Sequence, residues 1–276
     1  MSKIGFIGMG NMGRSILNSL METHSKEDLL FSCKHPERGQ AISKKTGVRF
    51  EPSNAEVAKE ADIIILAVRK KDFDVVLDEI NYEVVGRKIV VTMAPAVSIA
   101  YVSKQLGGFA RVVRALPNSP ARVKTGMTGL AYDGYQFSDE DIRNIKDLFG
   151  SIGRIIKVDE SMIDTLTVVN ATGSAFVYMF IDALANSGVR YGLSKHDAIE
   201  MVAQTVMGCA KMVLETGEHP IVLSDQICIP SGTTIEAIAA LDEAGFRNAV
   251  MKGAEACYRK TQDGADAKYQ LKPKKK

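Results

Sequence analysis

Three glycines near the start of the chain have the spacing of a nucleotide-binding loop. The segment Gly8-Met9-Gly10-Asn11-Met12-Gly13 fits the pattern G-x-G-x-x-G, and it lies between a short apolar run and a helical pattern. In such a loop Gly8 permits a tight turn, Gly10 lets a pyrophosphate approach the main chain, and Gly13 lets the helix pack closely on the strand. The N–H groups at the start of the helix also favour a phosphate. The sequence therefore predicts a dinucleotide site, with Gly8, Gly10, Asn11 and Met12 among its contacts.

The charges that follow the second expected strand favour a phosphorylated dinucleotide. An NAD-type site has an acidic side chain about 20 residues after the glycine loop, where it binds the ribose 2′-hydroxyl. Here no carboxylate occurs after this strand before Glu37. Lys34 and Arg38 are instead placed to meet a 2′-phosphate, so we expect NADP, with NADH bound at lower affinity. The alternative is that both are solvated surface charges.

A polar loop in the last third of the chain is typical of a carboxylate site. Residues 229–236 read Ile-Pro-Ser-Gly-Thr-Thr-Ile-Glu and lead into a helical pattern. Main-chain N–H groups that converge at a helix start suit a small carboxylate. The alternative is an ordinary helix start, in which Thr233 or Thr234 is the N-cap residue.

A third segment, residues 114–122, lies at the carboxyl end of an expected strand. Ligands of open α/β sheets bind in this region, and Pro117 and Pro120 would make a rigid wall there. Without a ligand it would be an ordinary turn.

The remaining reactive side chains form no constellation. The 4 cysteines and 4 histidines are dispersed, with no C-x-x-C pair and no metal-ligand spacing, and G-x-S-x-G is absent. We therefore expect no metal and no protein nucleophile. The cofactor would carry the reaction, and the protein would orient the reactants.

The elements that must position these residues alternate in the first part of the chain. Short β-branched runs indicate strands, and amphipathic stretches between them indicate helices, which favours a parallel sheet covered on both faces. The expected strands cover residues 3–7, 29–32, 62–68, 88–92, 111–115, 128–132 and 154–158, and the expected helices cover 12–22, 54–59, 72–80 and 98–106, with a further helix after an N-cap at Ser138.

Strand patterns stop after residue 159, and helical patterns follow at residues 161–187, 195–215, 234–243 and 246–262. The predicted fold class is α/β, with an N-terminal Rossmann-type doubly wound parallel sheet over residues 1–159 and an all-helical domain over residues 160–276. Residues 165–181 carry no charge but include several polar side chains, so we interpret them as a buried helix and expect no membrane span.

Composition fits a globular chain and excludes several classes. Of the 276 residues, 46% are hydrophobic and 25% are charged, and the formal net charge is only +2, which gives no basic excess for nucleic acid. Five lysines fall within residues 268–276, which we interpret as a solvated tail. The N-terminus enters a strand pattern at once, so we expect no signal peptide and a cytoplasmic protein with reduced thiols.

These segments, in this order, resemble the pyrroline-5-carboxylate reductase family over nearly the whole chain. Residues 4–13 are similar to the start of the family, which related β-hydroxyacid dehydrogenases share, and residues 54–58 and 61–68 resemble its third and fourth strand region. Residues 114–121 resemble its R-x-M-P-N-T-P-A segment. The most specific likeness is Ser231-Gly-Thr-Thr-Ile235, followed by Glu236, Ala237 and Leu241, which is similar to the family's S-P-G-G-T-T-I.

The chain departs from the family pattern at three places. Arg69-Lys70 stands where the family has Lys-Pro. Residues 170–176 read Asn-Ala-Thr-Gly-Ser-Ala-Phe in place of S-G-S-G-P-A-Y, and Pro230-Ser231-Gly232 replaces P-G-G. These changes concern the nicotinamide side and the dimer helix.

The resemblance implies NADPH-dependent reduction of L-1-pyrroline-5-carboxylate to L-proline, the last step of proline biosynthesis. It implies that Ser231, Gly232, Thr233 and Thr234 bind the substrate carboxylate through N–H groups, and that the Thr234 hydroxyl faces the ring nitrogen as the catalytic contact. Further cofactor contacts that the resemblance implies are Asn54, Ala67, Val68, Arg69 and Pro117. It also implies a homodimer formed through the helical domain, or a decamer of such dimers, with a small-molecule substrate and neither nucleic acid nor membrane as a partner.

Other functions remain open from the sequence. The enzyme could reduce another cyclic imine carboxylate, or it could be a non-catalytic nucleotide-binding paralogue. A β-hydroxyacid dehydrogenase would carry a catalytic lysine on its long interdomain helix, and no lysine occurs between Lys157 and Lys195.

Overall fold

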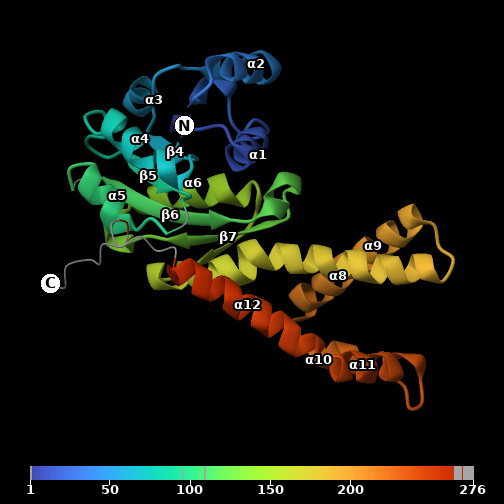
Figure 1. Ribbon diagram of the computed structural model, residues 1–276. Helices are drawn as coiled ribbons and strands as arrows, with labels where there is room; N and C mark the ends of the chain where they lie inside the picture. The colour runs from blue at the N-terminus through green and yellow to red at the C-terminus, as the bar shows by residue number, and fades with distance from the viewer. Residues whose placement is uncertain (1, 95, 109, 264–268, 270–276) are drawn as a thin grey trace. The chain divides into compact units, whose positions relative to one another are not determined.

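A sheet of eight strands forms the centre of the first part of the chain (Figure 1). The computed structural model describes residues 2–94, 96–108, 110–263 and 269, so lysines 268–276 of the expected tail lie outside the described residues. The strand order is β3-β2-β1-β4-β5-β6-β7-β8. The strands are β1 (Ile4–Ile7), β2 (Leu29–Ser32), β3 (Arg49–Phe50), β4 (Ile63–Leu66), β5 (Ile89–Thr92), β6 (Arg111–Pro117), β7 (Gly126–Ala131) and β8 (Gly153–Lys157).

The expected parallel sheet is confirmed except at one pair. Strands β6 and β7 run antiparallel, with Arg114 opposite Ala131, whereas all other neighbours are parallel. The short connection between them, residues 118–125, holds only the 3₁₀ turn η3 (Ser119–Val123). A parallel crossover needs about a dozen residues or more, so this connection can only return the chain antiparallel.

Two apolar cores, one on each face, explain why these segments form a central sheet. Strands β1, β2, β4 and β5 are buried along their whole length. Helices α1 (Asn11–Leu20), α2 (Pro36–Thr46) and α6 (Asp139–Gly150) contribute to one core. Helices α3 (Asn54–Glu60), α4 (Phe73–Ile80) and α5 (Ile99–Gln105) contribute to the other.

Helix α2 and strand β3 of this sheet unit were not predicted. Helix α2 is mostly polar, and its only buried residue is Gly39, where an added Cβ would lie 2.3 Å from the Phe50 ring on β3. The signals that do mark α2 are Pro36 at its first position and Gly47, with φ +77°, at its end.

The N-cap expected at Ser138 is confirmed: Ser138 and Asp141 form a reciprocal capping box.

A buried cation joins the end of β6 to the segment that follows β8. Arg114 is 4% exposed, and its guanidinium lies 3.4 Å from Glu160 Oε1 and 3.7 Å from Asp164 Oδ1. The segment continues through α7 (Ile163–Leu166) into a π-helix (η6, Thr167–Thr172), in which Asn170 Nδ2 donates to the carbonyls of Leu116 and Met127. These contacts fix residues 160–170 against the sheet.

The chain divides into two compact units, Met1–Ala171 with Tyr258–Lys276, and Thr172–Cys257. The division falls after the predicted boundary at residue 159 because Asp164 and Asn170 bind the sheet unit. The second unit is helical, with α8 (Gly173–Arg190), α9 (Lys195–Thr216), α10 (Pro220–Asp225), α11 (Thr233–Glu243) and the first part of α12 (Phe246–Asp263). Within the described residues of this unit only Ala185 and Ala198 are buried.

Candidate active site

A cleft of about 830 Å³ lies at the carboxyl ends of β1, β2 and β4. This is the edge where the turn after β1 and the start of α1 meet, as expected for a dinucleotide fold. The cleft brings together most of the cofactor contacts expected from the sequence: Gly8, Gly10, Lys34, Arg38, Asn54, Ala67, Val68 and Arg69.

The three loop glycines differ in the space around them. Gly8 has φ +94°, and a Cβ there would lie 2.7 Å from Val68 Cγ1 and 2.8 Å from the Ala67 carbonyl oxygen. A Cβ on Gly13 would lie 2.9 Å from the Gly8 oxygen, so this residue sets the close packing of α1 on the sheet. A Cβ on Gly10 would meet nothing nearer than the Ala67 oxygen at 4.0 Å. Packing therefore does not require a glycine at position 10. The free space at the Gly10 Cα opens on the cleft.

The start of α1 suits a diphosphate. Gly10 is its N-cap, with φ −72° and no side chain to accept from the first-turn N–H groups. These donors have no acceptor inside the helix and carry the positive end of its dipole. The residues present thus fit the pyrophosphate of a dinucleotide.

Two basic side chains line the cleft where a 2′-phosphate is expected. Arg38 Nη2 donates to the Met9 carbonyl at 3.2 Å, which holds the arginine against the glycine loop. Lys34 Nζ lies 3.2 Å from Asp72 Oδ1, and Arg69 Nε lies 3.3 Å from Asp72 Oδ2. The hydrogen bond from Lys34, with the charge of Arg69, holds the pKa of the Asp72 carboxyl below its usual value.

Asp72 and Glu79 are cleft residues that the sequence analysis missed. Asp72 precedes α4 and belongs to an element far from β2 in the sequence, so no local pattern indicates its pairing with Lys34. Glu79 Oε2 accepts from Asn54 Nδ2, while Asn54 Oδ1 accepts from the buried Ser32 hydroxyl. These two hydrogen bonds fix the orientation of Asn54, which lines the cleft.

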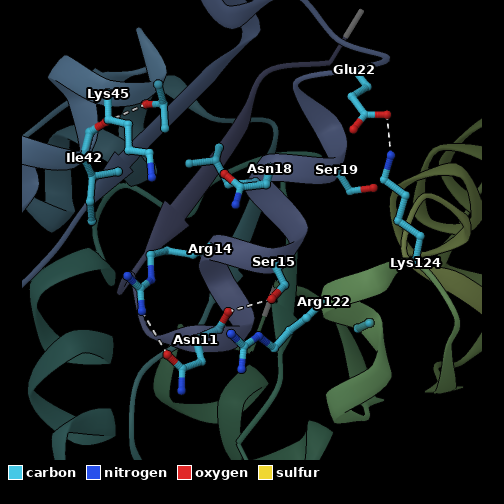
Figure 2. A pocket seen from close by; sticks show the side chains of 13 residues that line it. Asn11, Arg14, Ser15, Asn18, Ser19, Glu22, Ile42, Lys45, Arg122 and Lys124 are labelled. Carbon is cyan, nitrogen blue, oxygen red and sulfur yellow. Dashed lines mark hydrogen bonds and ion pairs between the residues drawn. The ribbon is translucent and has the colours of Figure 1, made fainter. Parts of the chain in front are cut away.

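Three expected cofactor residues do not line this cleft. Asn11 lines a neighbouring pocket, where its Oδ1 accepts from Arg14 Nη2 at 2.9 Å (Figure 2). Met12 packs against the apolar core, and Pro117 is the last residue of β6, opposite Thr128 on β7. Arg114, in the same segment as Pro117, is buried in the ion pairs with Glu160 and Asp164.

The expected substrate loop lies in the helical unit, at the start of α11. Its N-cap is Gly232, with φ −81° and ψ 164°, and no side chain caps the helix. The alternative that Thr233 or Thr234 is the N-cap residue is therefore wrong, because both lie inside the first turn. Ser231 has φ +59°, a left-handed conformation that favours glycine, which is the residue that the family pattern has there. No cluster of three or more metal-ligating side chains occurs among the described residues.

Both parts of the chain match models of known protein families. Residues 160–263 match the model for pyrroline-5-carboxylate reductase dimerisation, and residues 3–95 match the model for NADP oxidoreductase, coenzyme F420-dependent. Pyrroline-5-carboxylate reductase of Escherichia coli (strain K12) is 38% identical over 262 residues, which cover 94% of this chain and 97% of that protein. That of Methanosarcina acetivorans is 35% identical over 259 residues, 92% of this chain and 96% of that protein.

Solved structures give the same result. A pyrroline-5-carboxylate reductase from Coxiella burnetii matches with a TM-score of 0.87 at 28% identity, over 95% of this chain and 98% of that one. Plasmodium falciparum pyrroline carboxylate reductase with NADP bound matches with a TM-score of 0.85 at 27% identity, over 96% of this chain and 98% of that one.

Proposed function

The chain belongs to the pyrroline-5-carboxylate reductase family and is an NADP-dependent oxidoreductase of that type, and on this premise we propose that it reduces L-1-pyrroline-5-carboxylate to L-proline. The observation that carries the proposal is the free space at Gly10, beside the uncapped start of α1, in a cleft lined by Lys34 and Arg38. That combination suits the diphosphate and the 2′-phosphate of NADPH. The bound dinucleotide supplies the hydride that the imine carbon accepts.

The sheet unit, in this proposal, holds the cofactor and does no acid–base chemistry. The N–H groups at the start of α1 bind the pyrophosphate, and Gly10 leaves room for it. Lys34 and Arg38 bind the 2′-phosphate, for which Lys34 must be shared with Asp72. Asn54, Ala67, Val68 and Arg69 line the remaining cleft wall.

The loop before α11 holds the substrate. Ser231, Gly232, Thr233 and Thr234 supply main-chain N–H groups to the substrate carboxylate, helped by the helix dipole. Support for this role comes from the absence of any side-chain cap on α11, which leaves the first-turn N–H groups available. The half-buried Thr234 hydroxyl hydrogen-bonds the ring nitrogen. A cyclic imine is basic enough to be partly protonated near neutral pH, so the reaction does not require a strong protein acid.

We further propose that the helical unit forms a dimer, and that such dimers can assemble into a decamer. Residues 160–190 form a helical stretch that is long and apolar enough to cross a membrane by length and composition alone, and 11% of its most apolar window is buried. The side chains of Tyr178, Met179 and Leu184 on α8 are exposed by 58%, 71% and 44%. The match of residues 160–263 to a dimerisation domain favours a protein partner for this surface. We accordingly propose a cytoplasmic protein rather than a membrane-spanning one.

Light scattering at working concentrations tests the assembly. We expect a dimer or a multiple of dimers. A stable, active monomer would contradict the assignment of the α8 surface.

One kinetic experiment tests the reaction. The full chain is assayed for NADPH oxidation with pyrroline-5-carboxylate, with other cyclic imine carboxylates and with β-keto acids. We expect the highest kcat/KM for pyrroline-5-carboxylate. Faster turnover of another cyclic imine would reassign the substrate, and NADPH binding without turnover of any substrate would indicate a non-catalytic paralogue.

A further inference from the structure

A second pocket, of about 490 Å³, lies on the sheet unit between α1, α2 and η3 (Figure 2). This pocket is separate from the proposed cofactor cleft, because the two cavities share no lining residue. The two cavities approach each other at the start of α1. Its volume is within the range of pockets that bind small molecules. The proposed reaction assigns no role to it.

The charge of this pocket is strongly positive. Its lining includes the cations Arg14, Lys45, Arg122 and Lys124, and its only carboxylate is Glu22. Lys124 forms an ion pair with Glu22. Arg14, Lys45 and Arg122 form no ion pair with any described residue, so three positive charges from three separate elements face one cavity. Figure 2 shows these side chains around the cavity.

Arg14 also carries a donor without an acceptor. Its Nη2 donates to Asn11 Oδ1, but its Nε is buried and has no hydrogen-bond partner among the described residues. A guanidinium cannot lose its charge in a protein, and a buried donor without an acceptor is unfavourable. An anion at this end of the pocket would offset the charge of the guanidinium group, while the buried Nε itself has no surface open to a ligand.

The neutral lining suits a polar ligand rather than an apolar one. Asn18 is exposed, the hydroxyls of Ser15 and Thr46 donate to main-chain carbonyls, and Thr46 Oγ1 also accepts from the Val48 N–H. Ile42 and Leu17 add a small apolar area. From the three cations without an ion-pair partner among the described residues, and from the volume, we propose that this pocket binds a small phosphorylated metabolite, with its phosphate held by Arg14, Lys45 and Arg122.

Pyrophosphate is the probe for this proposal. The full chain is first saturated with NADP, so that the cofactor cleft is filled, and is then titrated with pyrophosphate in a calorimeter at constant ionic strength. We expect a saturable site that persists with NADP bound. Each of Lys45→Ala and Arg122→Ala should weaken binding by about tenfold, because each removes one charged contact to the phosphate.

A matched control is available on the same helix. Lys44 is exposed and adjacent to Lys45 but does not line the pocket, so Lys44→Ala should leave the affinity unchanged. Lys45 and Arg122 are also exposed, so the test variants should fold and bind NADP as the parent does. The proposal is overturned if the NADP-saturated chain does not bind pyrophosphate, if Lys45→Ala and Arg122→Ala do not weaken binding, or if Lys44→Ala weakens it equally.

Discussion

Replacing Gly10 with valine should separate cofactor binding from folding. A Cβ at this position would have only the Ala67 oxygen within reach, at 4.0 Å, and the φ of −72° is open to any residue. The added Cβ therefore introduces no clash, and the cost of valine at an N-cap should not exceed about 1 kcal/mol of unfolding free energy. The added methyl groups would, however, occupy the space through which the diphosphate reaches the N–H groups of α1.

The loss of affinity can be sized from the donors that would be blocked. A hydrogen bond to a charged group contributes about 1.5–3 kcal/mol, so the loss of two such bonds weakens NADPH binding by about 10²- to 10⁴-fold. Gly10→Ala should fall between the parent and Gly10→Val. Fluorescence titration with NADPH and thermal melting of the same samples measure the two effects.

Two other glycines serve as controls. Gly134→Val adds the same side chain where the nearest atom is Lys157 Nζ at 3.6 Å, away from the cleft, and should change neither property. Gly8→Ala should destabilise the fold itself, because of its contacts below 3 Å and its φ of +94°. If folded Gly10→Val binds NADPH as tightly as the parent, the loop does not receive the diphosphate and our reasoning is refuted.

Three further substitutions test the remaining site residues. Lys34→Asp should raise the KM for NADPH by about tenfold or more and that for NADH far less, because it removes a charged contact to the 2′-phosphate; equal effects on both cofactors would contradict the assignment. Thr234→Ala should lower kcat and kcat/KM together by about tenfold with unchanged NADPH affinity. A variant that melts earlier but turns over normally would make Thr234 structural. Ser231→Gly should leave the unfolding free energy unchanged or raise it by up to about 1 kcal/mol, because relief of the left-handed strain offsets the added chain entropy, whereas Ser231→Val should lower it. Chemical denaturation compares the two, and equal stability of both variants would show that the φ of +59° costs nothing.

The strands of the sheet could be predicted because buried strands have short, mostly apolar and β-branched sequences. The run Ile63–Leu66 is apolar without alternation, as a strand covered on both faces requires. The antiparallel return from β6 to β7 was not predicted. The expected strands, residues 111–115 and 128–132, left residues 116–127 between them, about enough for a crossover, whereas β6 and β7 extend toward each other and leave only residues 118–125. Helix α2 was missed for the opposite reason: its only buried residue is Gly39, and Ile42 alone of its large apolar side chains packs against the core, so it has no apolar stripe.

The features of the candidate cleft that depend on main-chain conformation could be predicted from the sequence. Those that depend on ion pairs between distant elements could not. The different demands on Gly8, Gly10 and Gly13 follow from the motif and agree with the space around each residue. The pairing of Lys34 with Asp72 depends on how the start of α4 approaches the end of β2. No spacing in the sequence encodes that distance.

The sparse burial in the helical unit links its stability to protein concentration. Only Ala185 and Ala198 are buried among its described residues, so this unit alone removes little apolar surface from water. In the proposed dimer, most of the free energy that holds these helices would come from association, and it would enter through mass action. Dilution should act on this protein as a denaturant does: each tenfold fall in chain concentration lowers the apparent stability of a dimer by about 1.4 kcal/mol.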